Sequence, residues 1–79
     1  MMKALIYTKQ NCSYCVKAKN LLNIKQVEFT EVEIGKDMLR EDFISMFPEQ
    51  KSVPLIFIDD NRIGGYDDLR KYFDSKANA

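Results

Sequence analysis

The pattern of apolar and polar residues along the chain predicts short strands and helices. Two continuous apolar runs, 4–7 and 55–58, are each ended by polar residues, which is typical of strands buried on both faces of a sheet. Residues 27–34 alternate in strand fashion, but the phase slips at Thr30 and Glu31. We therefore expect a strand here that carries a bulge or is shorter than the whole segment.

A turn follows the second buried run. Residues 59–61, Asp-Asp-Asn, are turn formers, and they lead into a brief return strand at 62–63 that ends at Gly64 and Gly65. The run at 55–58 and the return strand are therefore expected to form an antiparallel hairpin.

Three other segments show apolar residues at helical spacing. Their apolar positions are Cys15, Ala18, Leu21 and Leu22, then Leu39, Phe43, Met46 and Phe47, and finally Leu69, Tyr72 and Phe73. The first helix is expected to open at Ser13, and the second to be capped by Asp37 and stopped by Pro48. The third is expected to begin near Asp67, whose carboxylate suits the positive end of a helix, and to fray over residues 75–79.

The order of these elements is β-α-β-α-β-β-α, which predicts a three-layer α/β fold. The first two strands are expected to be parallel neighbours joined by a right-handed crossover. A chain of 79 residues with 46% hydrophobic content has room for one compact core, so we expect one domain over residues 1–79.

The charge balance limits the partners that the chain is expected to bind. Lys and Arg total 12 and Asp and Glu total 12, so no net charge attracts nucleic acid or an anionic membrane. The apolar run after Lys3 is too short for a signal-peptide core or a membrane span. We therefore expect a cytoplasmic chain that binds neither, and a monomer, because no apolar helix face is left over.

The two cysteines, Cys12 and Cys15, are too close in sequence for a disulfide between them to restrain much of the unfolded chain. Their spacing at a helix start suits thiol-disulfide exchange, which needs an attacking thiolate and a second thiol that resolves the mixed disulfide. Cys12 is expected to be the nucleophile, because unpaired N–H groups of the first turn, and Lys9 nearby, favour negative charge there. Cys15, about one turn further along the apolar face beside Ala18 and Leu22, is expected to resolve.

Two other interpretations of the cysteine pair stay open at this point. Reduced cysteine is a common buried residue, so both could be structural, although the strand before and the helix after the pair favour a redox role. Cysteine pairs also bind zinc or iron. With two thiols and no histidine, one chain cannot complete a four-ligand site, so a cluster would need a second subunit or outside ligands.

Three separated motifs make the chain resemble the glutaredoxin family from residue 5 to residue 73. Ile-Tyr-Thr-Lys at 6–9 leads into Cys-Ser-Tyr-Cys at 12–15, as in the family's first strand and active site. Ser-Val-Pro at 52–54 resembles its Thr-Val-Pro loop, and Gly-Gly-Tyr-Asp-Asp-Leu at 64–69 resembles its Gly-Gly-x-x-Asp segment.

The resemblance implies a thioredoxin fold, with a four-stranded mixed sheet flanked by three helices. It also implies a glutathione-dependent oxidoreductase that reduces protein disulfides and glutathione mixed disulfides, with Cys12 as nucleophile and Cys15 as resolving thiol. Ribonucleotide reductase is a partner that the family suggests and that no residue here identifies.

Glutathione carries two carboxylates and one ammonium, so its site needs cations or N–H donors at two ends and one carboxylate. The residues expected to bind it are Lys9, Tyr14, Val53, Pro54, Asp67 and Asp68. The glycine carboxylate is expected at Lys9, with Arg40 or Lys51 as further candidates.

By resemblance, the Val53 backbone pairs with the cysteine unit of glutathione, and the N–H groups of Asp67 and Asp68 hold the γ-glutamyl carboxylate, with the Asp68 carboxylate on the ammonium. Without the family match, plainer interpretations hold: Lys9 is a solvated lysine, Tyr14 fills a loop, and the two aspartates are helix-start acids.

Two details of the motifs lead to further expectations. The Val53–Pro54 bond is expected to be cis, by resemblance and because Leu55 at once begins a buried strand. Ser13 stands where the commonest family motif has proline, and some family members with serine there bind a [2Fe-2S] cluster across a dimer with glutathione as extra ligands. Cluster binding by Cys12 is therefore one alternative function; an electron donor served by thioredoxin reductase is another, against which Lys9 and the two aspartates argue.

Overall fold

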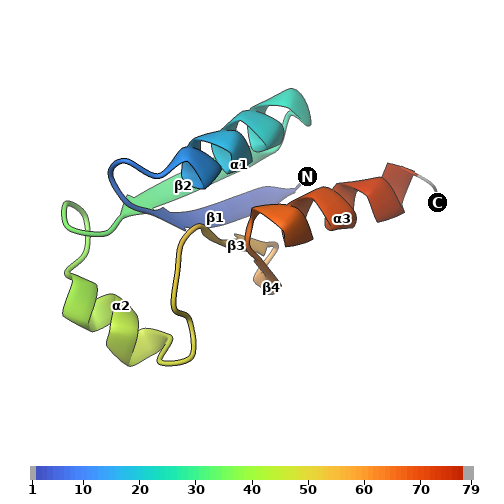
Figure 1. The fold of residues 1–79 in the computed structure, drawn as a ribbon. Helices are drawn as coiled ribbons and strands as arrows, with labels where there is room; N and C mark the ends of the chain where they lie inside the picture. Colours follow the sequence, from blue (N-terminus) through green and yellow to red (C-terminus); the bar gives the residue numbers. More distant parts are fainter. Residues whose placement is uncertain (1, 78–79) are drawn as a thin grey trace.

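The computed structural model describes residues 2–77, and Figure 1 shows their arrangement. Their elements are β1 (Lys3–Thr8), α1 (Ser13–Ile24), β2 (Glu28–Glu33), α2 (Arg40–Met46), β3 (Leu55–Ile58), β4 (Asn61–Gly64) and α3 (Tyr66–Ala77). The predicted order of strands and helices is confirmed.

The four strands form one mixed sheet in the order β2-β1-β3-β4. β1 and β2 are parallel, as predicted, while β3 pairs antiparallel with both β1 and β4. β2 pairs with β1 in unbroken register, so the predicted bulge is absent from β2. The alternative prediction, a strand shorter than residues 27–34, is confirmed. The phase slips because both faces of β2 are covered: Phe29 packs toward one core cluster and Val32 toward the other.

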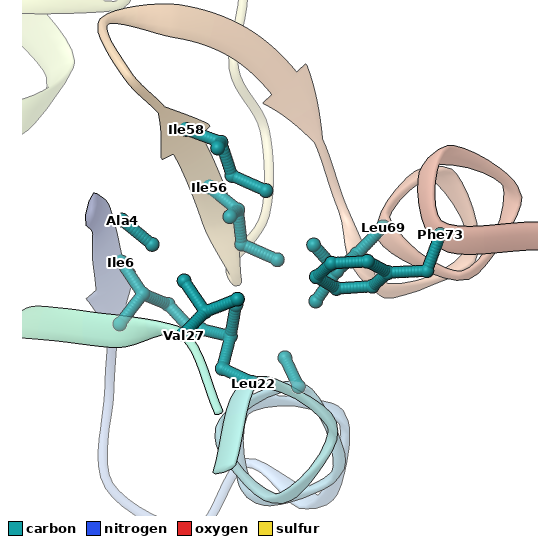
Figure 2. Close-up of a cluster of buried hydrophobic side chains, with 9 residues drawn as sticks. Ala4, Ile6, Leu22, Val27, Ile56, Ile58, Leu69 and Phe73 are labelled. Carbon is teal, nitrogen blue, oxygen red and sulfur yellow. The ribbon is translucent and has the colours of Figure 1, made fainter. Parts of the chain in front are cut away.

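The core lies on both faces of the sheet. One face packs against α1 and α3, and Figure 2 shows how their buried side chains meet those of β1 and β3. This cluster consists of Ala4, Ile6, Ala18, Leu22, Val27, Ile56, Ile58, Leu69 and Phe73. The other face packs against α2 through Tyr7, Phe43 and Leu55. Because neighbouring strand residues point to opposite faces, the continuous apolar runs of β1 and β3 serve both clusters.

The start of α2 differs from the prediction. Its N-cap is Leu39, without a side-chain hydrogen bond, while the Asp37 carboxylate accepts from the Glu33 N–H at 2.9 Å. Asp37 is therefore not the cap. Leu39 is 62% exposed and Met46 54%, because a helix of seven residues turns only a narrow stripe, centred on Phe43, toward the sheet.

The hairpin and the last helix are longer than predicted. β4 begins at Asn61, directly after a two-residue turn in which Asp59 and Asp60 both have positive φ, 49° and 67°. α3 continues to Ala77, so the expected fraying of residues 75–77 is wrong, while residues 78–79 lie outside the described part of the chain. No helix within residues 2–77 is long and apolar enough to cross a membrane.

Candidate active site

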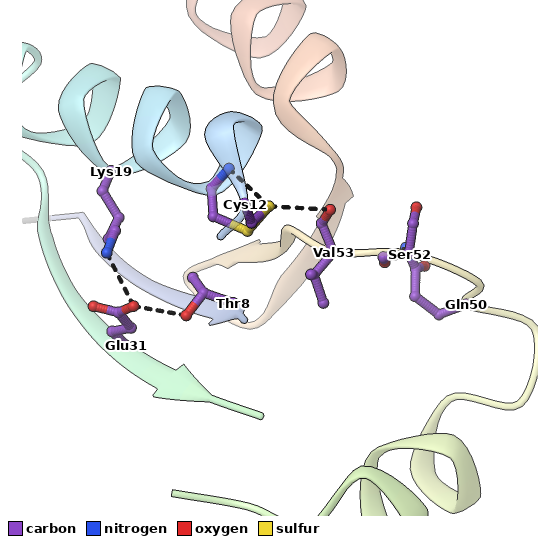
Figure 3. Close-up of a disulfide and its surroundings, with 8 residues drawn as sticks. Thr8, Cys12, Lys19, Glu31, Gln50, Ser52 and Val53 are labelled. Atoms are coloured by element: carbon purple, nitrogen blue, oxygen red, sulfur yellow. Dashed lines mark hydrogen bonds and ion pairs between the residues drawn. A yellow bond between two sulfur atoms is a disulfide. The ribbon is translucent and has the colours of Figure 1, made fainter. Parts of the chain in front are cut away.

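The cysteine pair lies where the loop after β1 enters α1 (Figure 3). Cys12 is the N-cap of α1 and Cys15 lies in its first turn, with a disulfide between them and 5.2 Å between their Cα atoms. Asn11, which precedes them, has φ 57°, a left-handed conformation that asparagine tolerates better than most residues. Cys12 is half-buried and Cys15 is 1% exposed, in the order of exposure that the sequence predicts.

Two backbone groups lie close to the Cys12 sulfur. Cys12 Sγ accepts a hydrogen bond from the Cys15 N–H at 3.2 Å, and it lies 3.8 Å from the Val53 carbonyl oxygen. The N–H bond and the positive end of α1 both stabilise negative charge on this sulfur. Of the two sulfurs, Cys12 Sγ is therefore the more accessible and the one with a hydrogen-bond donor beside it, while Cys15 is buried behind it.

Five of the predicted glutathione residues line one hollow of about 440 Å³ beside the cysteines. They are Tyr14, Val53, Pro54, Asp67 and Asp68. The Val53–Pro54 bond is cis, which confirms that prediction. The hollow thus joins the start of α1, the loop before β3 and the start of α3, three segments that are far apart in the sequence.

The start of α3 is fixed by Gly64, Gly65 and Asp68. The Asp68 carboxylate accepts from the Gly65 N–H at 3.2 Å, which is a capping interaction. Gly64 has φ 119°, and a Cβ at this position would collide with the Asp68 carboxylate. The plainer interpretation of Asp68, a helix-start acid, is therefore part of its role, and Asp68 is also one of the residues that line the hollow.

The remaining predicted residue, Lys9, lines a second hollow of about 560 Å³ together with Arg40 and Lys51. Val53 lines both hollows, so they adjoin at this residue. The three candidates for the glycine carboxylate are thus brought together, in a hollow whose lining residues include none from α3.

Four residues that line the first hollow, Gln50, Ser52, Gly65 and Tyr66, were not among the predicted glutathione residues, although the last three lie in the motifs that carry the resemblance. Tyr66 packs against Tyr14, with ring centroids 6.0 Å apart, and its place inside the Gly-Gly-x-x-Asp segment is a signal that could have identified it. Gln50 donates to the Ser52 carbonyl and accepts from Arg62, both at 2.8 Å, and so holds the loop before Val53. Nothing in a polar loop distinguishes this glutamine in advance.

A polar cluster lies on the other side of the cysteines, in a hollow of about 580 Å³ that Cys12, Cys15, Lys19 and Glu31 line. The buried Thr8 hydroxyl donates to Glu31 Oε2 at 2.6 Å, and Lys19 Nζ donates to the same oxygen at 3.0 Å. The hydrogen bond from Thr8, followed by the bond and charge of Lys19, lowers the pKa of Glu31 against the opposing effect of burial.

Within residues 2–77 no group of three or more His, Cys, Asp or Glu side chains could hold a metal ion.

Comparison with known proteins gives the class. The glutaredoxin family model matches residues 4–63, so the chain belongs to the glutaredoxin family. Glutaredoxin 3 of Escherichia coli is 47% identical over 70 residues, which cover 87% of this chain and 83% of that protein. The chain spans 70% of glutaredoxin 1 from Rickettsia prowazekii and 64% of that from Rickettsia typhi, each 43% identical over 67 residues.

Two solved structures agree with this assignment. Glutaredoxin 1 from Francisella tularensis, complexed with cacodylate, has a TM-score of 0.80 and 34% identity, and the match covers 100% of both chains. A buckwheat glutaredoxin–glutathione complex has a TM-score of 0.74 and 26% identity over 92% of this chain and 70% of that one. The thioredoxin fold is confirmed, and the family together with the Cys12–Cys15 pair supports a thiol-disulfide oxidoreductase.

Proposed function

We propose that this chain is a glutathione-dependent oxidoreductase that reduces protein disulfides and glutathione mixed disulfides. The observation that carries the proposal is the hollow in which Tyr14, Val53 and the start of α3 meet beside the half-buried Cys12. A thiol-disulfide exchange site without a peptide-like ligand needs no such hollow, and the buckwheat relative is solved as a glutathione complex.

The first step is attack of the Cys12 thiolate on one sulfur of the substrate disulfide. A mixed disulfide with Cys12 forms, the substrate S–S bond breaks, and the leaving thiolate takes a proton from solvent. The N–H of Cys15 and the start of α1 stabilise the attacking thiolate.

The mixed disulfide is resolved in one of two ways. When Cys12 carries glutathione, the thiolate of a second glutathione attacks the sulfur of the bound one. Glutathione disulfide forms, and Cys12 leaves as the reduced thiolate. When Cys12 carries a protein, Cys15 attacks Cys12 Sγ, the protein thiolate leaves, and the Cys12–Cys15 disulfide forms. Two glutathione molecules then reduce that disulfide. Cys15 reacts only inside the site because it is 1% exposed.

Glutathione is held in this proposal by both hollows. The Val53 backbone pairs with its cysteine unit, and the first-turn N–H groups of α3, which have no partner within a helix, bind the γ-glutamyl carboxylate. Asp68 receives the ammonium, and Lys9 in the second hollow receives the glycine carboxylate.

The test is reduction of a small glutathione mixed disulfide, coupled to NADPH through glutathione reductase. Wild type is expected to be active, Cys12→Ser inactive, and Cys15→Ser active on this substrate but not on protein disulfides. Activity with thioredoxin reductase and none with glutathione would overturn the glutathione site. Inactivity with both, together with visible absorbance after anaerobic purification, would favour a [2Fe-2S] dimer.

Three further proposals concern the setting of this activity. The chain acts in the cytoplasm as a monomer, and ribonucleotide reductase is one protein disulfide that it reduces. Fractionation of cells, sedimentation of the reduced protein and an assay on oxidised ribonucleotide reductase test them separately.

A further inference from the structure

The hollow lined by Lys9, Arg40 and Lys51 carries more positive charge than one carboxylate needs. Three cations, Lys9, Arg40 and Lys51, line it, and no acidic residue is among its described lining residues. The chain as a whole has equal numbers of acidic and basic residues, so this positive charge is local. Its apolar lining comes from Ile34, Phe43, Ile44, Pro48 and Val53.

Glutathione does not account for this lining. Its residue at this end is glycine, which has no side chain to fill an apolar hollow, and its single carboxylate is satisfied by one cation or two. Ile44 is 47% exposed, so part of the apolar lining is open to solvent when no client protein is bound. Two features of the hollow, its apolar lining and its surplus of cations, are thus left for a ligand other than glutathione.

We propose that this hollow docks a segment of the protein client in which an apolar residue and an acidic residue follow the reactive cysteine. The proposal rests on the glutathione orientation given above, since a peptide laid in the same direction along Val53 places the residues after its cysteine there. Val53 offers backbone pairing to such an extended segment, and alternate side chains give specificity in strand addition. The apolar side chain contacts the exposed Ile44, and the carboxylate faces Arg40 and Lys51.

The test uses the Cys15→Ser variant with glutathione bound to Cys12, and measures its exchange with peptide thiols. Each exchange forms one mixed disulfide between Cys12 and the peptide and releases one glutathione thiol, so the equilibrium constant compares the two ligands directly. Three capped peptides are compared: cysteine followed by Leu-Glu, cysteine followed by Ser-Gln, and Glu-Leu placed before the cysteine. The first is expected to exchange about tenfold more favourably than the others, which corresponds to about 1.4 kcal/mol.

Two variants at exposed positions test whether the advantage of the Leu-Glu peptide arises in this hollow. Ile44→Ser is expected to remove most of the advantage of the Leu-Glu peptide while leaving turnover of the small glutathione mixed disulfide unchanged. Lys51→Glu is expected to lower the advantage, and added salt to lower it in wild type, because the ion pairs are exposed.

Equal exchange of the three peptides, or an advantage that survives both variants, would overturn the docking proposal. Neither result touches the glutathione assay, which uses no peptide. Conversely, a chain inactive with glutathione would still exchange peptides at Cys12, so the failure of one proposal is distinguishable from the failure of the other.

Discussion

Replacing Gly64 by alanine tests the link between the start of α3 and the proposed glutathione site. Gly64 has φ 119°, which L-residues rarely adopt, and its new Cβ would displace the Asp68 carboxylate from the Gly65 N–H. The backbone conformation costs about 1 to 3 kcal/mol and the lost cap about 0.5 to 2 kcal/mol. The expected loss of unfolding free energy is therefore about 1.5 to 5 kcal/mol.

Gly35→Ala is the matched control. Gly35 also has positive φ, 95°, but a Cβ there meets nothing within 4 Å, so only the backbone term applies. Urea unfolding of the two variants is expected to show that Gly64→Ala loses more stability. In an Asp68→Ala background, which removes the carboxylate but keeps the Asp68 Cβ close to the new methyl group, the cost of Gly64→Ala is expected to fall but to stay above that of Gly35→Ala.

The two glycine variants are also expected to differ in their KM for a glutathione substrate. Gly64→Ala is expected to raise the KM for a small glutathione mixed disulfide, because the Asp68 carboxylate is moved, whereas Gly35→Ala, which displaces no side chain, is expected to raise it less. Strictly additive costs for Gly64→Ala and Asp68→Ala would refute the reasoning, because the two side chains would then not interact.

The remaining predictions concern the core, the rim of the site and the polar cluster. Leu22→Ala, at a fully buried core position, should cost about 2 to 5 kcal/mol in urea unfolding; a loss below about 1 kcal/mol would contradict the packing. Tyr66→Ala should raise KM for the glutathione substrate severalfold through loss of its contact with Tyr14, with Tyr66→Phe near wild type. Because the pKa of Glu31 is lowered in the folded state, its contribution to stability is full above its ordinary value of 4.5 and is lost as pH falls below it. Glu31→Gln should therefore flatten the stability profile on the acid side of this value, and an unchanged profile would show that Thr8 and Lys19 do not stabilise the carboxylate.

The order of elements could be predicted because each element has its own local signal. The apolar runs of β1 and β3 and the helical spacing around Leu22 and Phe73 need no tertiary information. The cap of α2 could not be predicted in this way, since Asp37 turned out to bind the backbone of Glu33 instead. Helical spacing also does not show how many apolar residues of a short helix are buried, and in α2 Met46 is exposed although it follows the spacing.

In the site, too, some features have a local sequence signal and others depend on tertiary contacts. Cys12, Cys15 and the residues of the first hollow lie in motifs that sequence alone identifies, and the structure brings them together. The contact between Thr8 and Glu31 joins residues 23 apart on neighbouring strands, so it depends on the register of β1 and β2.

In the proposed function, glutathione attached to Cys12 lies along Val53 toward α3. Amide NMR shifts of the Cys15→Ser variant, compared between its glutathione and β-mercaptoethanol mixed disulfides, test this most directly. The two spectra are expected to differ most at Val53, Asp67, Asp68 and Lys9. Differences confined to residues 12–15 would contradict it.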